Sequence, residues 1–265
     1  MLDTEISTFF IPDGKIKGLV SIPHSGEFIP EEFKKYLTED LRLLAEDVDY
    51  KVNELVDINE LNNNNIAVLV SNVHRTCVDL NRSEDLAIIA WKKNSKGHVL
   101  EVNEFDKDFQ EAMLTKYHRP YFYKIKSTVD NLFIDQKRPV IIDLHSMPSR
   151  PTEYHLKVTP DQPKIRPDFC VSDISGVSCS KDFIDHMCEE LGSFSKNVTQ
   201  NIPYYGGHIT RHIQANFPDS QNIQIEISRG IYMDEDKKEL KDELVKELKP
   251  KLTRAIINQF SKFIL

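Results

Sequence analysis

The segment 139–145, PVIIDLH, decides the fold. Its three consecutive β-branched residues are typical of a strand buried on both faces of a sheet. His145 ends this segment, and a similar order occurs near the N-terminus, where the apolar run 18–22 leads into His24 of IPHSGE. In IPHSGE, Gly26 gives the chain a small residue at which it can turn away from the histidine. The sequence therefore predicts two buried strands that each deliver a histidine at the carboxyl end.

Further strand and helix patterns alternate along the chain. Short β-type runs also occupy 66–70 and 223–228. Helical spacing of apolar residues fills the segments between and after the strands, at 31–37, 38–58, 105–133, 181–191 and 234–264. Alternation of this kind predicts an α/β fold, here one domain spanning 1–265, with a central mixed, largely parallel sheet flanked by helices.

Three positions refine the helical expectations. Thr38 is a suitable N-cap for the helix predicted over 38–58. The long pattern at 105–133 should be interrupted before Pro120, because the residue before a proline avoids the helical conformation. The C-terminal segment 235–265 is amphipathic, and Pro250 should break or restart its helix.

Composition argues against several classes of protein. A net charge of −8 disfavours non-specific binding to nucleic acid, which requires a basic face. No apolar run approaches the length of a membrane span, and the acidic N-terminus lacks the basic and apolar regions of a secretory leader. The four cysteines form no Cys-x-x-Cys pair. We therefore expect a cytoplasmic protein with reduced cysteines and no membrane or nucleic-acid partner.

The two strand-end histidines are candidate metal ligands. Ligands gather at the carboxyl ends of strands in open α/β sheets, so His24 and His145 can converge although they are far apart in sequence. Two imidazoles, one carboxylate and an open position make a common catalytic zinc site. Two carboxylates compete for the third place, Glu27 three residues after His24 and Asp49 (or its neighbour Asp47) on the helix that follows.

Three other motifs carry groups suited to binding and proton transfer. HRTCVDLNR at 74–82 contains Arg75 and Arg82, whose guanidinium groups match a substrate carboxylate and which Asp79 can orient. NIPYYGGHITRHIQ at 201–214 combines paired glycines with a further arginine. IQIEISRGIY at 223–232 places Glu226 on an apolar strand, where a carboxylate is either a buried functional group or the polar face of an edge strand.

Eight motifs in this order resemble the N-formylglutamate amidohydrolase family, over about residues 19–236. They are SIPHSGEFIP, EDVDYKVNEL, HRTCVDLNR, YHRPYFYKI, VIIDLHSMPS, RPDFCVSDISGVSC, PYYGGHITRH and IQIEISRGIYMDED. The family is related in fold to the zinc carboxypeptidases and aspartoacylases. The resemblance implies a zinc-dependent hydrolase that cleaves the N-acyl amide of an acidic amino acid such as N-formyl-L-glutamate, a reaction of amino-acid catabolism.

The resemblance also implies roles for individual residues. His24, Asp49 and His145 resemble the ligands of one Zn²⁺ per chain, with Glu27 as the second choice of carboxylate. The resemblance further implies Glu226 as general base, Arg75, Asn81 and Arg82 as a clamp on a substrate carboxylate, and Arg211 as a further substrate contact. Arg75 is also expected to be catalytic, since one arginine would stabilise the forming oxyanion together with the zinc.

The chain departs from the family at one of these motifs. Where the family often has TRHYG, this chain has TRHIQ after Arg211, which affects the expected fit of the substrate. A zinc hydrolase of other N-acyl amino acids or of short peptides, and a non-catalytic binding protein on the same fold, are the alternatives.

Overall fold

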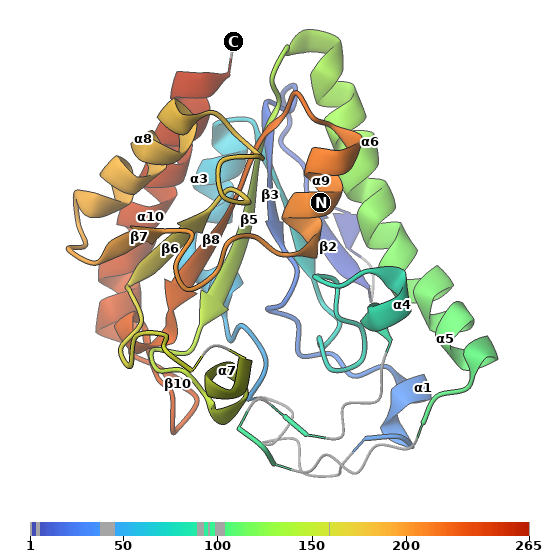
Figure 1. Cartoon of the computed structure of the whole chain (residues 1–265). Helices are drawn as coiled ribbons and strands as arrows, with labels where there is room; N and C mark the ends of the chain where they lie inside the picture. Colours follow the sequence, from blue (N-terminus) through green and yellow to red (C-terminus); the bar gives the residue numbers. More distant parts are fainter. Residues whose placement is uncertain are drawn as a thin grey trace.

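A mixed eight-stranded sheet forms the centre of the computed structural model (Figure 1). The structure describes residues 2–3, 6–37, 46–88, 93–94, 96–98, 104–158 and 160–264. Across the sheet the strands are, in order, β1 (Leu2–Asp3), β2 (Ser7–Phe10), β4 (Ile66–Ser71), β3 (Gly18–Ile22), β5 (Val140–Met147), β8 (Gln221–Ser228), β6 (Phe169–Ser172) and β7 (Val198–Gln200).

The four central strands β4, β3, β5 and β8 run parallel to one another. β2 joins β4 and β6 joins β8 in the antiparallel sense, which makes the sheet mixed. Every residue of the four central strands is buried, because helices cover both faces of the sheet. The predicted α/β domain with a mixed, largely parallel sheet is confirmed.

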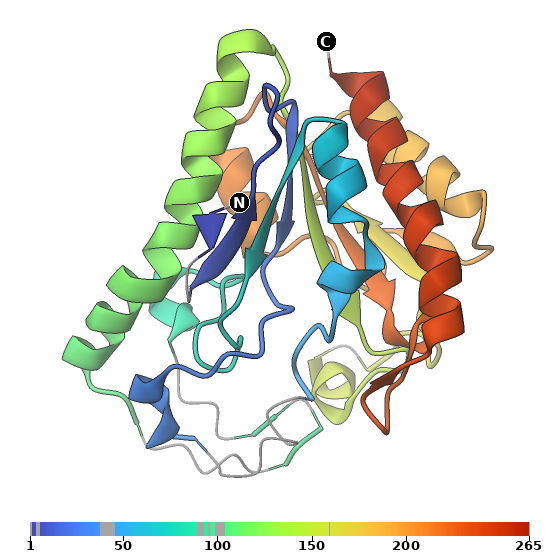
Figure 2. The ribbon, with the colours of Figure 1, turned by 180° about the vertical axis from the view of Figure 1, so that it is seen from behind.

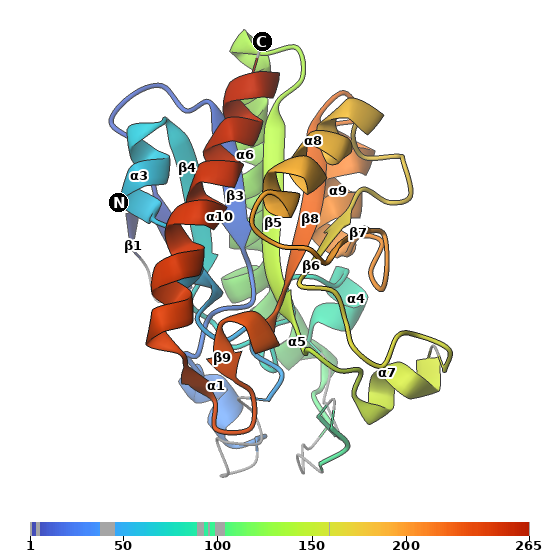
Figure 3. The same ribbon diagram turned by 90° about the vertical axis from the view of Figure 1, so that its left-hand side faces the viewer.

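Helices pack on the two faces of the sheet as separate layers (Figures 1 and 2). One layer contains α5 (Lys107–Met113), α6 (Arg119–Asp135) and α9 (His208–Asn216). The other contains α3 (Ile58–Asn63), α8 (Lys181–Gly192) and α10 (Asp242–Phe263), of which α8 and α10 face the viewer in Figure 3. Each layer buries its own apolar core against the sheet, and the carboxyl ends of the central strands are left to the loops.

Short elements occupy the connections. They are α1 (Glu31–Lys34), the 3₁₀ turn η1 (Val52–Leu55), α4 (Glu84–Ala87), the π turn η2 (Leu114–His118), α7 (Glu153–Val158), the 3₁₀ turn η3 (Arg229–Ile231) and the small hairpin β9 (Met233–Asp234) with β10 (Glu239–Leu240). The four cysteines are free thiols. Among the described residues, no helix has the length and apolar character needed to cross a membrane.

The continuous helix predicted over 38–58 is wrong in its described part. Thr38, its expected N-cap, belongs to 38–45 and lies outside the described residues. Residues 46–50 form turns, Lys51 adopts a left-handed conformation with φ of 58°, and the chain then makes η1. Asp57 starts a separate helix, α3, because its side chain accepts a hydrogen bond from Glu60 N. Asp49 therefore lies in a turn rather than on a helix.

Two prolines behave differently in the long helices. Before Pro120 the helix widens into η2, which separates α5 from α6 as the predicted interruption requires. Pro250 lies inside α10 without breaking it, contrary to the expectation. It is exposed, and Leu248 and Leu252 on either side pack into the core, so tertiary packing holds the helix together across the missing N–H.

Candidate metal centre and active site

Two neighbouring parallel strands bring His24 and His145 together. His24 follows the end of β3, and His145 lies near the end of β5, within the strand. Their ring centroids are 4.9 Å apart, and both residues are 2% exposed. Asp49 comes from the turn before η1, where its backbone N–H donates to His24 O over 3.0 Å. This bond fixes the turn beside the strand end, although Asp49 is not part of the sheet.

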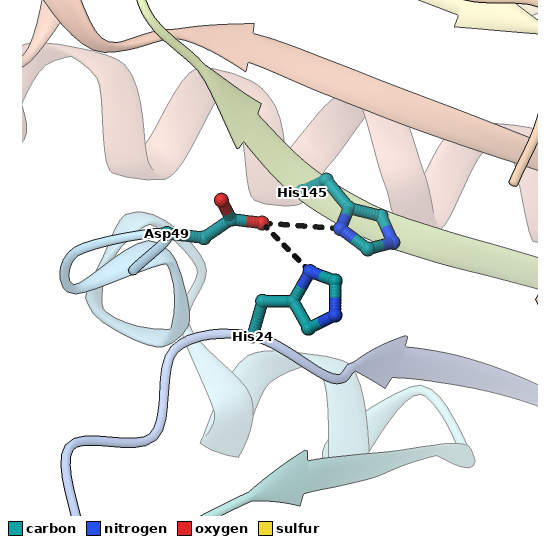
Figure 4. Close-up of side chains that lie close together, drawn as sticks. All are labelled: His24, Asp49 and His145. Atoms are coloured by element: carbon teal, nitrogen blue, oxygen red, sulfur yellow. Dashed lines mark hydrogen bonds and ion pairs between the residues drawn. The ribbon is translucent and has the colours of Figure 1, made fainter. Parts of the chain in front are cut away.

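Both histidines present Nδ1 to one oxygen of Asp49 (Figure 4). Asp49 Oδ2 lies 3.1 Å from His145 Nδ1 and 3.7 Å from His24 Nδ1. One ligand atom from each of the three residues lies within 4.8 Å of the other two. Two nitrogens and a carboxylate oxygen at this spacing can hold a divalent ion such as Zn²⁺.

Carboxylates behind the histidines fix their orientation. Asp79 Oδ1 lies 2.8 Å from His24 Nε2, and Asp143 Oδ2 lies 2.9 Å from His145 Nε2. A carboxylate that accepts a hydrogen bond from Nε2–H fixes the tautomer in which Nδ1 is the free ligand atom, and such a carboxylate is the usual outer contact of metal-bound histidine. His24 Nδ1 is buried and has no hydrogen-bond partner among the described residues. The donor set therefore fits a metal ion.

Buried charges shift the pKa values of this group. Burial acts to raise the pKa of Asp49, but the hydrogen bond from His145 and the nearby imidazole of His24 prevail and hold it well below the ordinary value. Burial acts to lower the pKa of His145, yet Asp143 and Asp49 raise it well above the ordinary value. In the metal-free protein the carboxylates thus favour a protonated imidazole, so a metal ion would replace a proton at this centre.

Two arginines, the half-buried Arg75 and the buried Arg229, balance the aspartates. Arg75 Nη2 donates to Asp79 Oδ2 over 2.8 Å, and Arg229 Nη2 donates to Asp49 Oδ1 over 3.1 Å. Sequence reasoning assigned a role to Arg75 but not to Arg229. The signal for Arg229 is its position directly after the strand that carries Glu226.

Glu226 lies beside His145 because the two residues are partners in the parallel register of β5 and β8. β8 is an inner strand between β5 and β6, so the edge-strand reading of this segment is wrong. Burial raises the pKa of Glu226 above its ordinary value. Gln224 Nε2 donates to Glu226 Oε1 over 2.7 Å and leaves the carboxylate otherwise facing the cleft that Glu226 helps to line.

The predicted substrate contacts also line this cleft, which has a volume of about 890 Å³. Asn81 Oδ1 accepts from Ile209 N over 3.0 Å, which ties the 74–82 segment to the start of α9. A Cβ atom at Gly207 would lie 2.2 Å from Asn81 Nδ2, which explains the glycine. Arg82 and Arg211 line the cleft as exposed side chains.

The alternative carboxylate, Glu27, lies apart from the two histidines. Its side chain is 49% exposed, and its Oε1 lies 3.8 Å from Lys51 Nζ. Neither the metal-binding group nor the lining of the cleft includes it. Asp47 does line the cleft, but Asp49 is the acid that meets both imidazoles.

Fold and site together define an α/β protein with a buried His–Asp–His group at the carboxyl edge of its sheet, in an arginine-lined cleft. Comparison with known proteins gives the family. The chain belongs to the N-formylglutamate amidohydrolase family, whose sequence model matches residues 16–233.

Relatives and solved structures agree with this assignment. The chain is 25% identical over 236 residues to N-formylglutamate deformylases of Pseudomonas putida and Pseudomonas aeruginosa, with 84% of each chain covered. The crystal structure of N-formylglutamate amidohydrolase from Ralstonia eutropha JMP134 superposes with a TM-score of 0.83 at 23% identity, covering 98% of both chains. A gene product of Agrobacterium tumefaciens superposes with a TM-score of 0.69 at 15% identity, covering 96% of this chain and 95% of the other. At these identities the two structures establish the fold.

Proposed function

We propose that this chain is a metal-dependent amidohydrolase that removes the formyl group from N-formyl-L-glutamate. One observation carries the proposal: a buried two-histidine, one-carboxylate group lies beside a buried carboxylate of raised pKa in the same cleft. Membership of the family and the names of the Pseudomonas relatives support the choice of substrate.

His24, Asp49 and His145 would hold the ion, with one Zn²⁺ per chain as the proposed metal. The orphaned Nδ1 of His24 and the aspartates behind both imidazoles support this assignment. When bound, Zn²⁺ acts as a Lewis acid that lowers the pKa of water towards about 7. Asp79 and Asp143 keep the Nε2 protons in place and so hold both rings in the ligand orientation.

Glu226 is the proposed general base. Its register with His145 puts its carboxylate beside the metal-binding group, and burial raises its pKa towards the range useful for proton transfer at neutral pH. It accepts the proton of the attacking water and then delivers that proton to the nitrogen of the leaving glutamate. Gln224 keeps the carboxylate oriented through its hydrogen bond to Oε1.

Arginines bind the substrate and stabilise developing charge. Arg75 uses one nitrogen on Asp79 and can donate another N–H to the oxyanion that forms on the formyl carbon. Asn81 and Arg82, which follow Asp79 on the same segment, would bind the α-carboxylate of the amino acid. Arg211 would contact the substrate from α9 on the same side of the cleft.

Metal content and turnover should be measured on the same samples of wild type, His145→Ala and Glu226→Gln, with N-formyl-L-glutamate as substrate. We expect about one zinc per wild-type chain, loss of zinc and turnover in His145→Ala, and retained zinc without turnover in Glu226→Gln. His186→Ala is the matched control, since this histidine lies on α8, away from the cleft, and should keep both properties.

Different results would separate the parts of the proposal. Wild type without bound metal and without turnover, even after zinc is added back, would refute the metal hydrolase. If the protein binds zinc but hydrolyses only N-acetyl amino acids or dipeptides, the proposed substrate is wrong and the proposed metal-dependent hydrolysis stands.

A further inference from the structure

Arg166 is a buried cation on the side of the cleft formed by residues 148–166. It precedes β6, and its backbone N–H donates to Ser149 O over 2.9 Å, which ties it to the segment after β5. The residue is 2% exposed and lines the cleft. It belongs to the motif RPDFCVSDISGVSC, for which sequence reasoning proposed no role.

The contacts of the Arg166 guanidinium are all with neutral groups. Nη1 donates to Tyr204 Oη over 2.9 Å and Nη2 donates to Gln162 Oε1 over 3.0 Å. Its central carbon lies 5.1 Å from the centroid of the Tyr204 ring. Nε is buried without a partner among the described residues. The guanidinium therefore retains donor capacity and lies in no ion pair among the described residues, although its charge acts on Glu226 and works against the rise that burial causes in the pKa of that carboxyl.

This pattern differs from that of Arg75 and Arg229, which also line the cleft. Arg75 pairs with Asp79 and Arg229 pairs with Asp49, whereas Arg166 forms no ion pair within the described part of the chain. Burying a charge without a direct ion-pair partner costs several kcal/mol in general. A buried guanidinium that lines a cleft and forms no ion pair is suited to bind an anionic ligand.

Tyr204 adds a second donor at the same place. Thr152 N donates to His155 Nδ1 over 3.2 Å, so the proton of the neutral ring sits on Nε2 and donates to Tyr204 Oη over 3.0 Å. Tyr204 Oη thus accepts from both His155 and Arg166, and its own O–H has no acceptor among the described residues. Burial raises the pKa of Tyr204 to about 12 and lowers that of His155 to about 4, so neither supplies a counter-charge at neutral pH.

The sheet places Arg166 opposite the predicted α-carboxylate contacts. Asn81 and Arg82 come from the segment after β4, whereas Arg166 comes from the segment before β6. Between β4 and β6 lie β3, which leads into His24, β5, which contains His145, and β8, which contains Glu226. A substrate that spans the cleft with its amide at the centre therefore has a cation at either end.

We propose that Arg166, with the Tyr204 hydroxyl, binds the side-chain carboxylate of an N-acyl dicarboxylic amino acid and selects such substrates over neutral ones. This inference rests on the proposed function for the position of the amide. Two N–H groups or an N–H and an O–H facing one carboxylate give charge-assisted hydrogen bonds, the strongest kind in proteins.

The test compares wild type, Arg166→Met and Arg150→Met on N-formyl-L-glutamate and N-formyl-L-glutamine. The second substrate has the same shape without the side-chain charge. We expect Arg166→Met to lower kcat/KM about 30-fold or more for the glutamate substrate and at most a few-fold for the glutamine substrate. Arg150 is an exposed arginine of the same segment and should leave both values unchanged. Tyr204→Phe should lower the glutamate value by a smaller factor.

A binding measurement separates this inference from the proposed function. Glutarate carries two carboxylates but no amide, and its affinity can be measured by calorimetry without turnover. Wild-type protein that binds glutarate, with binding lost in Arg166→Met, supports the carboxylate site even if N-formyl-L-glutamate is not hydrolysed. Equal binding by both proteins, or an unchanged glutamate-to-glutamine ratio in an active enzyme, overturns it. If Arg166→Met does not fold, Arg166→Lys takes its place. We then expect kcat/KM for the glutamate substrate to fall about 10-fold relative to the glutamine substrate, because lysine keeps the charge but lacks the paired N–H donors of guanidinium.

Discussion

Replacing Gly26 by alanine should distort the metal centre through a backbone clash. A Cβ atom at this position would lie 2.3 Å from the carbonyl carbon of Asn72, 2.4 Å from Asn72 O and 2.7 Å from Ser71 O. Gly26 has no positive φ, so its flexibility is not the reason for the glycine. The reason is the close approach of the loop after β3 to the end of β4.

The size of the effect follows from how tightly this loop is held. Ordinary contact begins at 3.4 Å, so the loop must move by about 1 Å. Phe28 N donates to Asn72 O over 2.9 Å and His74 N donates to Phe28 O over 2.8 Å, so the loop cannot swing away freely. Overpacking of this kind costs about 1–3 kcal/mol of the free energy of unfolding. A displacement of about 1 Å at His24 can lower turnover about 100-fold.

Calorimetry and steady-state kinetics test this prediction together. We expect Gly26→Ala to melt about 2–10 °C below wild type, and to show lower metal affinity and lower kcat/KM. Gly192→Ala is the matched control, because a Cβ there meets nothing within 4 Å and its φ is not positive. It should be neutral or slightly stabilising. A Gly26→Ala protein with wild-type melting temperature and turnover would refute the argument from close approach.

Three further changes probe the groups around the site. Asp79→Asn removes the carboxylate behind His24 and should weaken zinc binding about 10- to 100-fold in competition with a chelator; unchanged affinity would contradict its orienting role. Glu226 acts as a base only when ionised, and burial raises its pKa, so kcat/KM should fall as pH decreases through a value above the ordinary 4.5. A pH profile whose acid limb lies at or below 4.5 would exclude this role. Gly207→Ala should displace Asn81 and raise KM about 10-fold while metal content stays constant, and an unchanged KM would show that Asn81 does not bind substrate.

The sequence predicts the sheet and its two histidines because both depend on local patterns. Buried parallel strands appear as apolar β-branched runs, and a histidine directly after such a run lies at the carboxyl edge whatever the strand order. The parallel register of β3 with β5 was needed to show that His24 and His145 meet. Asp49 was expected on a helix, and only the left-handed turn at Lys51 and the bond from Asp49 N to His24 O explain its placement.

Local sequence patterns predict only some of the ion-pair partners of the arginines. Arg75 and Asp79 are four residues apart, so their pairing can be foreseen from the sequence. Arg229 pairs with Asp49 across 180 residues, whereas Arg166 forms no ion pair with any residue that the structure describes. Burial and the formation of ion pairs are properties of the folded chain, so no spacing rule separates Arg166 from an exposed arginine such as Arg150.

The three candidate metal ligands are far apart in the unfolded chain. Its three residues come from positions 24, 49 and 145, and they meet only when β3 and β5 are paired and the turn at 46–50 is docked. A nascent chain therefore acquires no such site until residue 145 has been synthesised and the centre of the sheet has closed. The proposed metal binding would then be linked to global folding, so a destabilising substitution far from the cleft would lower the apparent metal affinity, and a bound ion would raise the melting temperature of the whole domain.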